Sequence, residues 1–264
     1  MKPVVLVTGG SRGIGAATAW LAAQQGWAVA VNYTQDAAAA HAVVARIQDA
    51  GGLALAVQAD VGNEAQVLAM FAQIDQALPA WGARWAGLVN SAGVVDQAQR
   101  LEAMSVQRLE RMMRINVIGS MVCAREAIRR MSTQLGGPGG SIVNLSSVAA
   151  RLGGAGQYVD HAASKGAIES FTIGLARELA ADGIRVNAIS AGPIKTLAAS
   201  GIGDFRYIMK WNELNSPLRR NVTIDEVGNV AAFLLSDLAS GMTGQISYVD
   251  CGVSQTAVAV VEAP

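Results

Sequence analysis

Short apolar segments alternate with longer stretches of helical periodicity along the chain. Apolar runs of this kind, bounded by turn residues, are typical of buried β-strands. The runs that we predict as strands are residues 3–7, 28–32, 53–57, 87–90, 141–145, 185–189 and 246–249. Strands that alternate with helices build right-handed βαβ units, which form one parallel sheet covered by helices on both faces. The pattern therefore predicts an α/β fold with a doubly wound, parallel sheet of these seven strands.

The chain is predicted to form a single domain spanning residues 1–264, because no internal repeat interrupts the alternation. Its longest stretch outside the strand pattern has Gly201 and Gly203 near the middle and Pro217 near the end. Such a stretch is expected to be a helical lid over a substrate. The predicted parts are the body (1–189), the lid (190–220) and a last helix, last strand and tail (221–264).

Composition narrows the functional classes. Lys and Arg together number 20, as do Asp and Glu. The zero net charge argues against a nucleic-acid groove or a polybasic membrane surface. Cys123 and Cys251 fit neither a metal-binding spacing nor a disulfide framework, as expected in a reducing compartment. No signal-peptide region or apolar run of membrane-spanning length is present. We therefore expect a cytoplasmic protein without a metal, nucleic-acid partner or membrane anchor.

A glycine-rich loop, Thr8-Gly9-Gly10-Ser11-Arg12-Gly13-Ile14-Gly15, joins the first predicted strand to the first helix. Glycines allow a tight turn there, and backbone N–H groups at the helix N-terminus can bind a pyrophosphate. The arrangement predicts a Rossmann-type site for a nicotinamide dinucleotide. The expected contacts from this loop are Gly9, Ser11, Arg12, Gly13, Ile14 and Gly15.

The end of the second predicted strand bears on the choice of cofactor. Proteins that bind NAD usually place a carboxylate there to hold the ribose 2′-OH, but this chain has Asn32 and Tyr33. Arg12 can bind a 2′-phosphate through its guanidinium group. We therefore expect NADPH, with Asn32 among its contacts and NADH as the other possible cofactor. In the alternative interpretation, Arg12 only faces solvent.

Motifs along the chain resemble those of the short-chain dehydrogenase/reductase (SDR) family. The Gly-x3-Gly-x-Gly spacing of the loop, residues 144–147 and the segment that ends at Lys165 carry this resemblance, which covers essentially the whole chain. Ser91 departs from the family's Asn-Asn-Ala-Gly turn toward enoyl-acyl carrier protein (ACP) reductases, which have serine there. The resemblance implies further cofactor contacts at Asp60, Val61, Asn90, Ser91, Ala92 and Gly93.

The family also implies a catalytic set, of which one member is missing. Asn116, Ser147 and Lys165 match the proton-relay residues, and Lys165 is also expected to hold the cofactor ribose. The family's tyrosine would stand at 161, but the residue there is His161. An imidazole is shorter than a phenol and usually neutral near pH 7. We therefore expect His161 to replace tyrosine poorly.

Tyr158 offers a second spacing, because Tyr158 and Lys165 form the Tyr-x6-Lys pattern that resembles enoyl-ACP reductases. On one helix, residues 158, 161 and 165 would project from one face toward one site. The Lys165 ammonium would then lower the pKa of the Tyr158 phenol. In the alternative, Tyr158 is a structural aromatic residue packed under the lid.

The C-terminal third resembles bacterial enoyl-ACP reductases at residues 190–202 and 216–229, whereas residues 1–189 look more like 3-oxoacyl-ACP reductases and sugar dehydrogenases. The chain therefore resembles a mosaic, for which deliberate engineering and natural recombination both stay open. The resemblance implies cofactor contacts at Gly192, Pro193, Ile194 and Thr196. The apolar residues suited to an acyl chain are Leu197, Ala198, Ala199, Ile202, Phe205 and Ile208.

These features predict a nicotinamide-dependent reductase of 2-enoyl thioesters, with ACP as a candidate carrier of the acyl group. One alternative is a 3-oxoacyl-ACP reductase impaired by the loss of the usual tyrosine. The other is an inactive protein that only binds the cofactor. A homotetramer is expected from relatives of this length and from the apolar tail at 249–261, which is hard to expose on a monomer.

Overall fold

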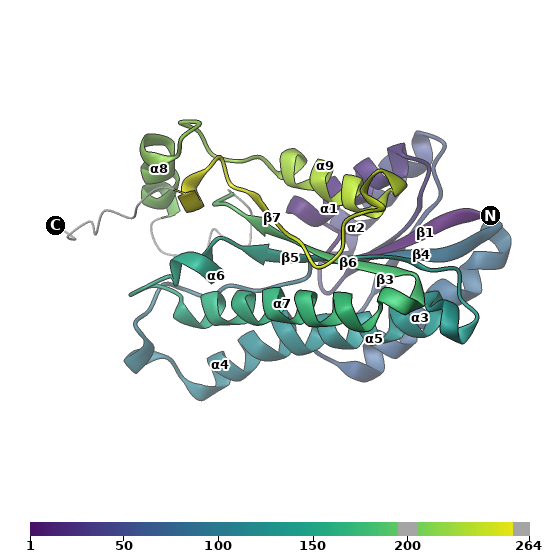
Figure 1. The fold of residues 1–264 in the computed structure, drawn as a ribbon, viewed down its shortest axis with the longest axis horizontal. Helices are drawn as coiled ribbons and strands as arrows, with labels where there is room; N and C mark the ends of the chain where they lie inside the picture. Colours follow the sequence, from purple (N-terminus) through teal and green to yellow (C-terminus); the bar gives the residue numbers. More distant parts are fainter. Residues whose placement is uncertain (195–204, 256–264) are drawn as a thin grey trace.

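The computed structural model describes residues 1–194 and 205–255, with the backbone alone for residues 205–207. Within this part of the chain, parallel strands form one seven-stranded sheet in the order β3-β2-β1-β4-β5-β6-β7 (Figure 1). The strands are β1 (Lys2–Thr8), β2 (Ala28–Tyr33), β3 (Ala54–Gln58), β4 (Ala83–Asn90), β5 (Gly140–Ser147), β6 (Ile184–Ala191) and β7 (Ile246–Val249). The predicted α/β fold with a doubly wound parallel sheet is confirmed.

Each predicted strand overlaps an observed one, and β4 shows the largest difference because it begins at Ala83 rather than at 87. The pairing of β1 with β4 shifts between Val4 and Val5, whose partners are Trp85 and Gly87. Ala86 is therefore an extra residue in β4. Such a bulge breaks the regular pairing and alternation of a strand, which explains why the apolar pattern revealed only its second half.

Helices cover both faces of the sheet (Figure 1). On one face lie α1 (Gly13–Gln24), α2 (Ala37–Asp49) and α9 (Ile224–Leu235). On the other face lie α3 (Glu64–Trp81), α4 (Val106–Met113), α5 (Ser120–Met131) and α7 (Val159–Glu178). The remaining described helices are α6 (Ala149–Leu152), α8 (Phe205–Asn215), the π-helix η2 (Arg114–Gly119) and the 3₁₀ turns η1 (Leu101–Ala103), η3 (Thr133–Leu135), η4 (Ala180–Asp182), η6 (Asp237–Ala239) and η7 (Val253–Gln255).

The core lies on both sides of the sheet, as the central strand β1 shows. Val4 and Leu6 pack into the cluster under α3 and α5, whereas Val5 and Val7 pack into the cluster under α1 and α9. All four side chains are fully buried. A strand covered on both faces needs apolar residues at every position rather than at alternate ones, and this is why β1 reads as a continuous apolar run.

The carboxyl ends of β1 and β4 adjoin at Thr8 and Asn90. The chain runs outward from β1 through β2 to β3 and then returns to β4 on the other side of β1. In open α/β sheets, ligands bind outside the carboxyl ends of the strands at such a reversal. The glycine-rich loop and the turn at 90–93 both follow strands at this edge, so the topology fixes where a cofactor can lie.

Among residues 1–194 and 205–255, none of the helices combines the length and the apolar character needed to cross a bilayer.

Candidate active site

The glycine-rich loop packs directly on the turn that follows β4. Gly9 has φ +62°, and a Cβ atom there would lie 2.9 Å from the Cα of Ala92. A Cβ atom on Gly15 would lie 2.3 Å from the carbonyl oxygen of Gly9. No side chain fits at either position, so the backbone itself forms the surface of the loop.

Helix α1 begins at this loop without a side chain over its first turn. Arg12 is the N-cap residue, and no side chain among the described residues accepts a hydrogen bond from the exposed amides there. By contrast, α2, α3, α4 and α9 are capped by side chains, namely those of Asp36, Asn63, Ser105 and Thr223. Uncapped N-terminal amides attract an anion, which the helix dipole also favours. The loop therefore fits the pyrophosphate of a dinucleotide.

Asn32 supports this loop from below, at the end of β2. Its side chain is buried, and its Oδ1 accepts a hydrogen bond from Gly9 N at 3.1 Å. Its Nδ2 donates to the carbonyl oxygens of Val57 at 3.3 Å and Ala59 at 3.0 Å. Both ends of the amide are engaged within the protein, so Asn32 shapes the loop instead of offering a free group to a ribose. Arg12 is exposed and has no ion-pair partner in the described part of the chain.

Thr8 joins the loop to the turn at 90–93 and was missed by the sequence analysis. Its hydroxyl accepts hydrogen bonds from the backbone N–H groups of Ser91 and Ala92, both at 3.0 Å. Asn90 is buried and donates to Asn144 Oδ1 at 2.9 Å, which ties β4 to β5. Threonine is common at the end of a strand, so the presence of Thr8 did not predict this contact.

Asp60 and Val61, which the family resemblance implies as cofactor contacts, lie after β3. Oδ1 of Asp60 accepts a hydrogen bond from Gly62 N at 2.9 Å, which closes a tight turn. The side chain of Val61 is buried, and it lies against Gly119 of the π-helix η2. These residues are therefore held in place by the turn and by η2.

Lys165 lies on α7 and is buried, and its Nζ donates a hydrogen bond to the carbonyl oxygen of Leu145 at 2.7 Å. Burial lowers the pKa of Lys165 from 10.5 to about 8. A Cβ atom on Gly93 would lie 3.7 Å from this Nζ and 3.3 Å from Oδ1 of Asn116. The structure thus brings together Gly93, Asn116 and Lys165. Ser147 ends β5, and its Oγ accepts a hydrogen bond from Ala149 N at 3.2 Å.

Asn116 lies in η2, a single π-helical segment between α4 and α5. Its Oδ1 accepts a hydrogen bond from Val94 N at 2.8 Å, and its Nδ2 donates to Val94 O and to Ser164 Oγ, both at 3.0 Å. The amide of Asn116 therefore holds the segment after β4 against α7. π-Helical turns are frequently found at functional sites, but no sequence pattern predicted this one.

Tyr158 lies outside the helix, contrary to our prediction. It is the N-cap residue of α7, with φ −152° and ψ 54°, and the helix begins at Val159. The i, i+3, i+7 argument therefore does not apply to it. Its ring packs on Gly154, where a Cβ atom would lie 2.7 Å from the ring. Burial raises the pKa of Tyr158, so the expected lowering by Lys165 is also wrong.

His161 takes the tyrosine position of the family on the first turn of α7. Its ring lies edge-on to that of Tyr158, with 6.2 Å between the centroids. Burial and then the charge of Lys165 lower the pKa of His161 from 6.5 to about 4, although the Val94 backbone and Asp160 act in the opposite direction. Its Nδ1 is buried and has no partner among the described residues. The imidazole is therefore neutral near pH 7.

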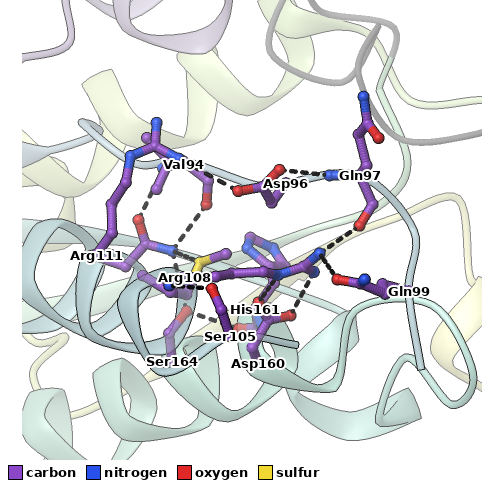
Figure 2. Close-up of polar contacts among 12 residues, drawn as sticks. Val94, Asp96, Gln97, Gln99, Ser105, Arg108, Arg111, Asp160, His161 and Ser164 are labelled. Carbon is purple, nitrogen blue, oxygen red and sulfur yellow. Dashed lines mark hydrogen bonds and ion pairs between the residues drawn. The ribbon is translucent and has the colours of Figure 1, made fainter. Parts of the chain in front are cut away.

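A buried ion pair beside His161 was also missed by the sequence analysis. Arg108 of α4 and Asp160 of α7 meet with Nε–Oδ2 at 2.8 Å (Figure 2). The two residues are 52 positions apart. Asp160 lies within the Tyr-x6-Lys segment noted in the sequence, whereas Arg108 belongs to no motif noted there, so nothing in the sequence paired the two.

The lid residues are only partly described. β6 ends at Ala191, and Gly192 follows with a Cβ position 2.8 Å from the Cα of Asp250. Ile194 is buried and Ile208 of α8 is half-buried. The predicted contacts that lie outside the described residues are Thr196, Leu197, Ala198, Ala199, Ile202 and the side chain of Phe205.

Comparisons with known proteins bear on this geometry. The family model described as "Enoyl-(Acyl carrier protein) reductase" matches residues 9–254. The chain is 47% identical to the uncharacterized oxidoreductase YgfF of Escherichia coli over 94% of this chain and 97% of that protein. It is 41% identical to an enoyl-ACP reductase of Rhizobium meliloti whose name specifies NADH, over 81% of this chain and 76% of that protein.

Two further similarities cover nearly the whole chain. A 3-oxoacyl-ACP reductase of Synechocystis is 36% identical over 95% of this chain and 96% of that protein. The solved structure of a short-chain dehydrogenase from Burkholderia cenocepacia in complex with NADP aligns with a TM-score of 0.84 and 30% identity, covering 96% of this chain and 97% of that one. With the fold, the uncapped loop at α1 and the buried lysine of α7, these matches identify the chain as an oxidoreductase of the short-chain dehydrogenase/reductase family.

Proposed function

We propose that the protein reduces 2-enoyl thioesters with NADPH. The observation that carries the proposal is the neutral imidazole at position 161, where the ketone-reducing relatives need a tyrosine. With its pKa lowered to about 4, His161 carries no acidic proton near pH 7. Carbonyl reduction requires proton donation to the developing alkoxide, whereas reduction of an enoyl double bond forms a stabilised thioester enolate that can be protonated later.

In this proposal, each residue of the site has a distinct role. When bound, the nicotinamide supplies a hydride for the β-carbon of the enoyl thioester. Burial raises the pKa of Tyr158, so its phenol stays protonated and donates a hydrogen bond to the enolate oxygen. Lys165 holds the ribose and contributes positive charge beneath the site. The acyl chain follows Ile194, Ile208 and the lid, and ACP is the proposed carrier.

NADPH is preferred over NADH in this proposal because Arg12 is exposed and unpaired within the described part of the chain. A guanidinium group can bind the 2′-phosphate through two parallel hydrogen bonds. Neither Asn32 nor Tyr33 at the end of β2 supplies a carboxylate for a ribose 2′-OH. The NADP complex of the Burkholderia relative supports NADPH, whereas the R. meliloti relative, whose name specifies NADH, supports NADH.

A second candidate function is reduction of 3-oxoacyl thioesters. Ser147 and Lys165 keep their family positions, and the 3-oxoacyl-ACP reductase of Synechocystis matches nearly the whole chain. Since only the tyrosine is absent, a weak ketone activity is expected from binding and orientation alone.

Cofactor consumption by the purified protein tests the proposal. NADPH is mixed with crotonyl or acetoacetyl thioester, as coenzyme A and ACP derivatives, and its absorbance is followed. We expect faster consumption with crotonyl substrates. Consumption with acetoacetyl substrates alone would establish the second candidate. Calorimetric binding of NADPH without turnover of either substrate would leave an inactive cofactor-binding protein.

A further inference from the structure

The buried ion pair between Arg108 and Asp160 connects two helices at the candidate active site. The side chains are 9% and 1% exposed, and the contacts are Nε–Oδ2 at 2.8 Å and Nη2–Oδ1 at 3.2 Å. Figure 2 shows the guanidinium lying alongside the carboxylate in this two-point arrangement. Such bidentate pairing fixes both distance and orientation.

The same guanidinium also holds the segment that runs from the turn after β4 toward α4. Nη1 of Arg108 donates to the carbonyl oxygen of Gln97 at 2.7 Å and to Oε1 of Gln99 at 3.2 Å (Figure 2). Gln99 N in turn donates to the carbonyl oxygen of Gln157 at 2.7 Å. One side chain therefore joins α4, the start of α7 and the 97–99 segment.

In the sequence, Asp160 lies between Tyr158 and His161, the two residues proposed to be near the substrate. Its Oδ1 accepts a second hydrogen bond from His161 N at 2.9 Å. Burial opposes ionisation of Asp160, but the hydrogen bonds from Arg108 and from the His161 backbone outweigh it and hold the pKa of Asp160 below its ordinary value. The carboxylate is thus charged and fixes the first turn of α7.

A buried ion pair contributes little to stability, because both ions lose their hydration. An apolar pair of similar volume would fold at least as well, so the value of this pair lies in the geometry that it enforces. We propose that the Arg108–Asp160 pair is a positioning clamp, which fixes the start of α7 and the 97–99 segment relative to each other. Through α7 the clamp sets where Tyr158 and His161 lie, so for catalysis this inference rests on the proposed function.

Imidazole NMR tests the clamp independently of any substrate, because the chain has only two histidines, His161 and His41. The negative charge of Asp160 raises the pKa of His161. If Asp160→Asn removes only the charge and His161 does not move, the pKa of His161 falls below its parent value of about 4. If the first turn of α7 moves, water reaches the imidazole ring and the pKa of His161 rises toward its ordinary value of 6.5. We expect the pKa of His161 to rise.

The double variant Arg108→Met/Asp160→Leu separates positioning from stability. Since neither charge is left unpaired, it should unfold near the melting temperature of the parent. We nevertheless expect the pKa of His161 in the double variant to be higher than in the parent, as in Asp160→Asn. We also expect kcat with crotonyl thioester to fall about 10- to 100-fold with KM little changed, because the reacting groups are misplaced. The matched control is Asp96→Asn, which breaks the exposed Arg111–Asp96 contact between the same helix and segment and should change neither quantity.

Parent-like His161 titration in the folded double variant, or a fall of the pKa in Asp160→Asn, would overturn the clamp. Arg108→Lys keeps the charge without the two-point contact, and it should give an intermediate His161 pKa. If the parent does not turn over crotonyl thioester, the proposed function fails, but the NMR titration still decides the clamp.

Discussion

At the scale of single residues, His161 and Lys165 share a buried corner of the site, and burial disfavours the charged form of both. Their mutual repulsion lowers the pKa of His161 further. Tyr158, whose ring meets that of His161, keeps its proton because its ionised form would also be buried. The site therefore holds a neutral imidazole and a protonated phenol near pH 7.

Tyr158→Phe tests the phenol. It removes a hydroxyl that acts on the developing enolate charge, so kcat for crotonyl thioester should fall by about ten- to a thousandfold with little change in KM. Steady-state kinetics measures both constants. Tyr248→Phe, on the partly exposed β7 residue, is the control. Equal enoyl rates for parent and Tyr158→Phe would remove the phenol from the mechanism.

His161→Tyr should have the opposite effect on ketones. It restores the family's tyrosine four residues before Lys165 and on the helix that carries it. Reduction of acetoacetyl thioester should rise by about a hundredfold or more, as expected from a positioned acid, while enoyl reduction stays level or declines. Absence of any gain in a folded, NADPH-binding variant would contradict this interpretation of position 161.

His161 should also make stability depend on pH. Between pH 6.5 and about 4, the unfolded chain binds a proton that the folded imidazole excludes. The free energy of unfolding should therefore fall by about 3 kcal/mol from this residue as the pH drops through that window. Urea unfolding of parent and His161→Gln from pH 7 to 4 measures the difference. The control, His41→Gln, removes the other histidine of the chain, which is exposed.

At the scale of elements, two connections shape the candidate site. Between β1 and α1, the loop leaves helix amides uncapped and relies on Asn32 for its shape. Between α4 and α5, the π-helix η2 turns the Asn116 amide toward the segment after β4. In both connections a buried side-chain amide, that of Asn32 or Asn116, fixes a backbone segment that lines the candidate site.

Cofactor preference follows from the first of these connections. Arg12→Ala should weaken NADPH binding and erase most of the difference from NADH, because the charge-assisted contact with the 2′-phosphate is lost. Isothermal titration calorimetry measures both affinities. In the control Asn32→Ala, the loop loses its support and both cofactors should bind more weakly by a similar factor. Tighter binding of NADH by the parent would show that the assignment of the second strand is wrong.

At the scale of the whole molecule, several exposed apolar side chains lie on helices that cover one face of the sheet. They belong to α4, η2, α5 and α7, which lie on the same face (Figure 1). The side chains are Val106, Met113, Ile118, Met121 and Ile173. Exposed apolar side chains can take part in contacts between subunits.

We predict a homotetramer in solution from this face and from the apolar tail, of which residues 256–261 lie outside the described chain. Light scattering at micromolar concentration should give the mass of four chains, and Ile118→Glu should lower it by placing a charge in the contact. Leu238→Glu changes an 84% exposed residue of η6 and is the control. A monomeric parent would contradict the prediction.

Sequence by itself determined the sheet and the tight glycine turn after its first strand. The seven apolar runs overlap every described strand. The central strands are apolar because they are buried on both faces, and the partly exposed edge strands β3 and β7 still contain a short apolar run. The glycines of the loop predicted a tight turn, because only glycine fits where backbones approach this closely. The absence of tyrosine at 161 was equally plain, since it depends only on the spacing to Lys165.

Only the tertiary structure decided what surrounds these residues. Tyr158 precedes the helix because the glycine turn before it ends there, which a periodic pattern does not reveal. The amide of Asn32 is hydrogen-bonded to Gly9 and to Val57 of β3, and Arg108 meets Asp160 across 52 residues. Such contacts join segments far apart in the chain, so they arise from packing of the finished fold. The same packing sets the pKa of His161, because burial, rather than residue type, decides its charge.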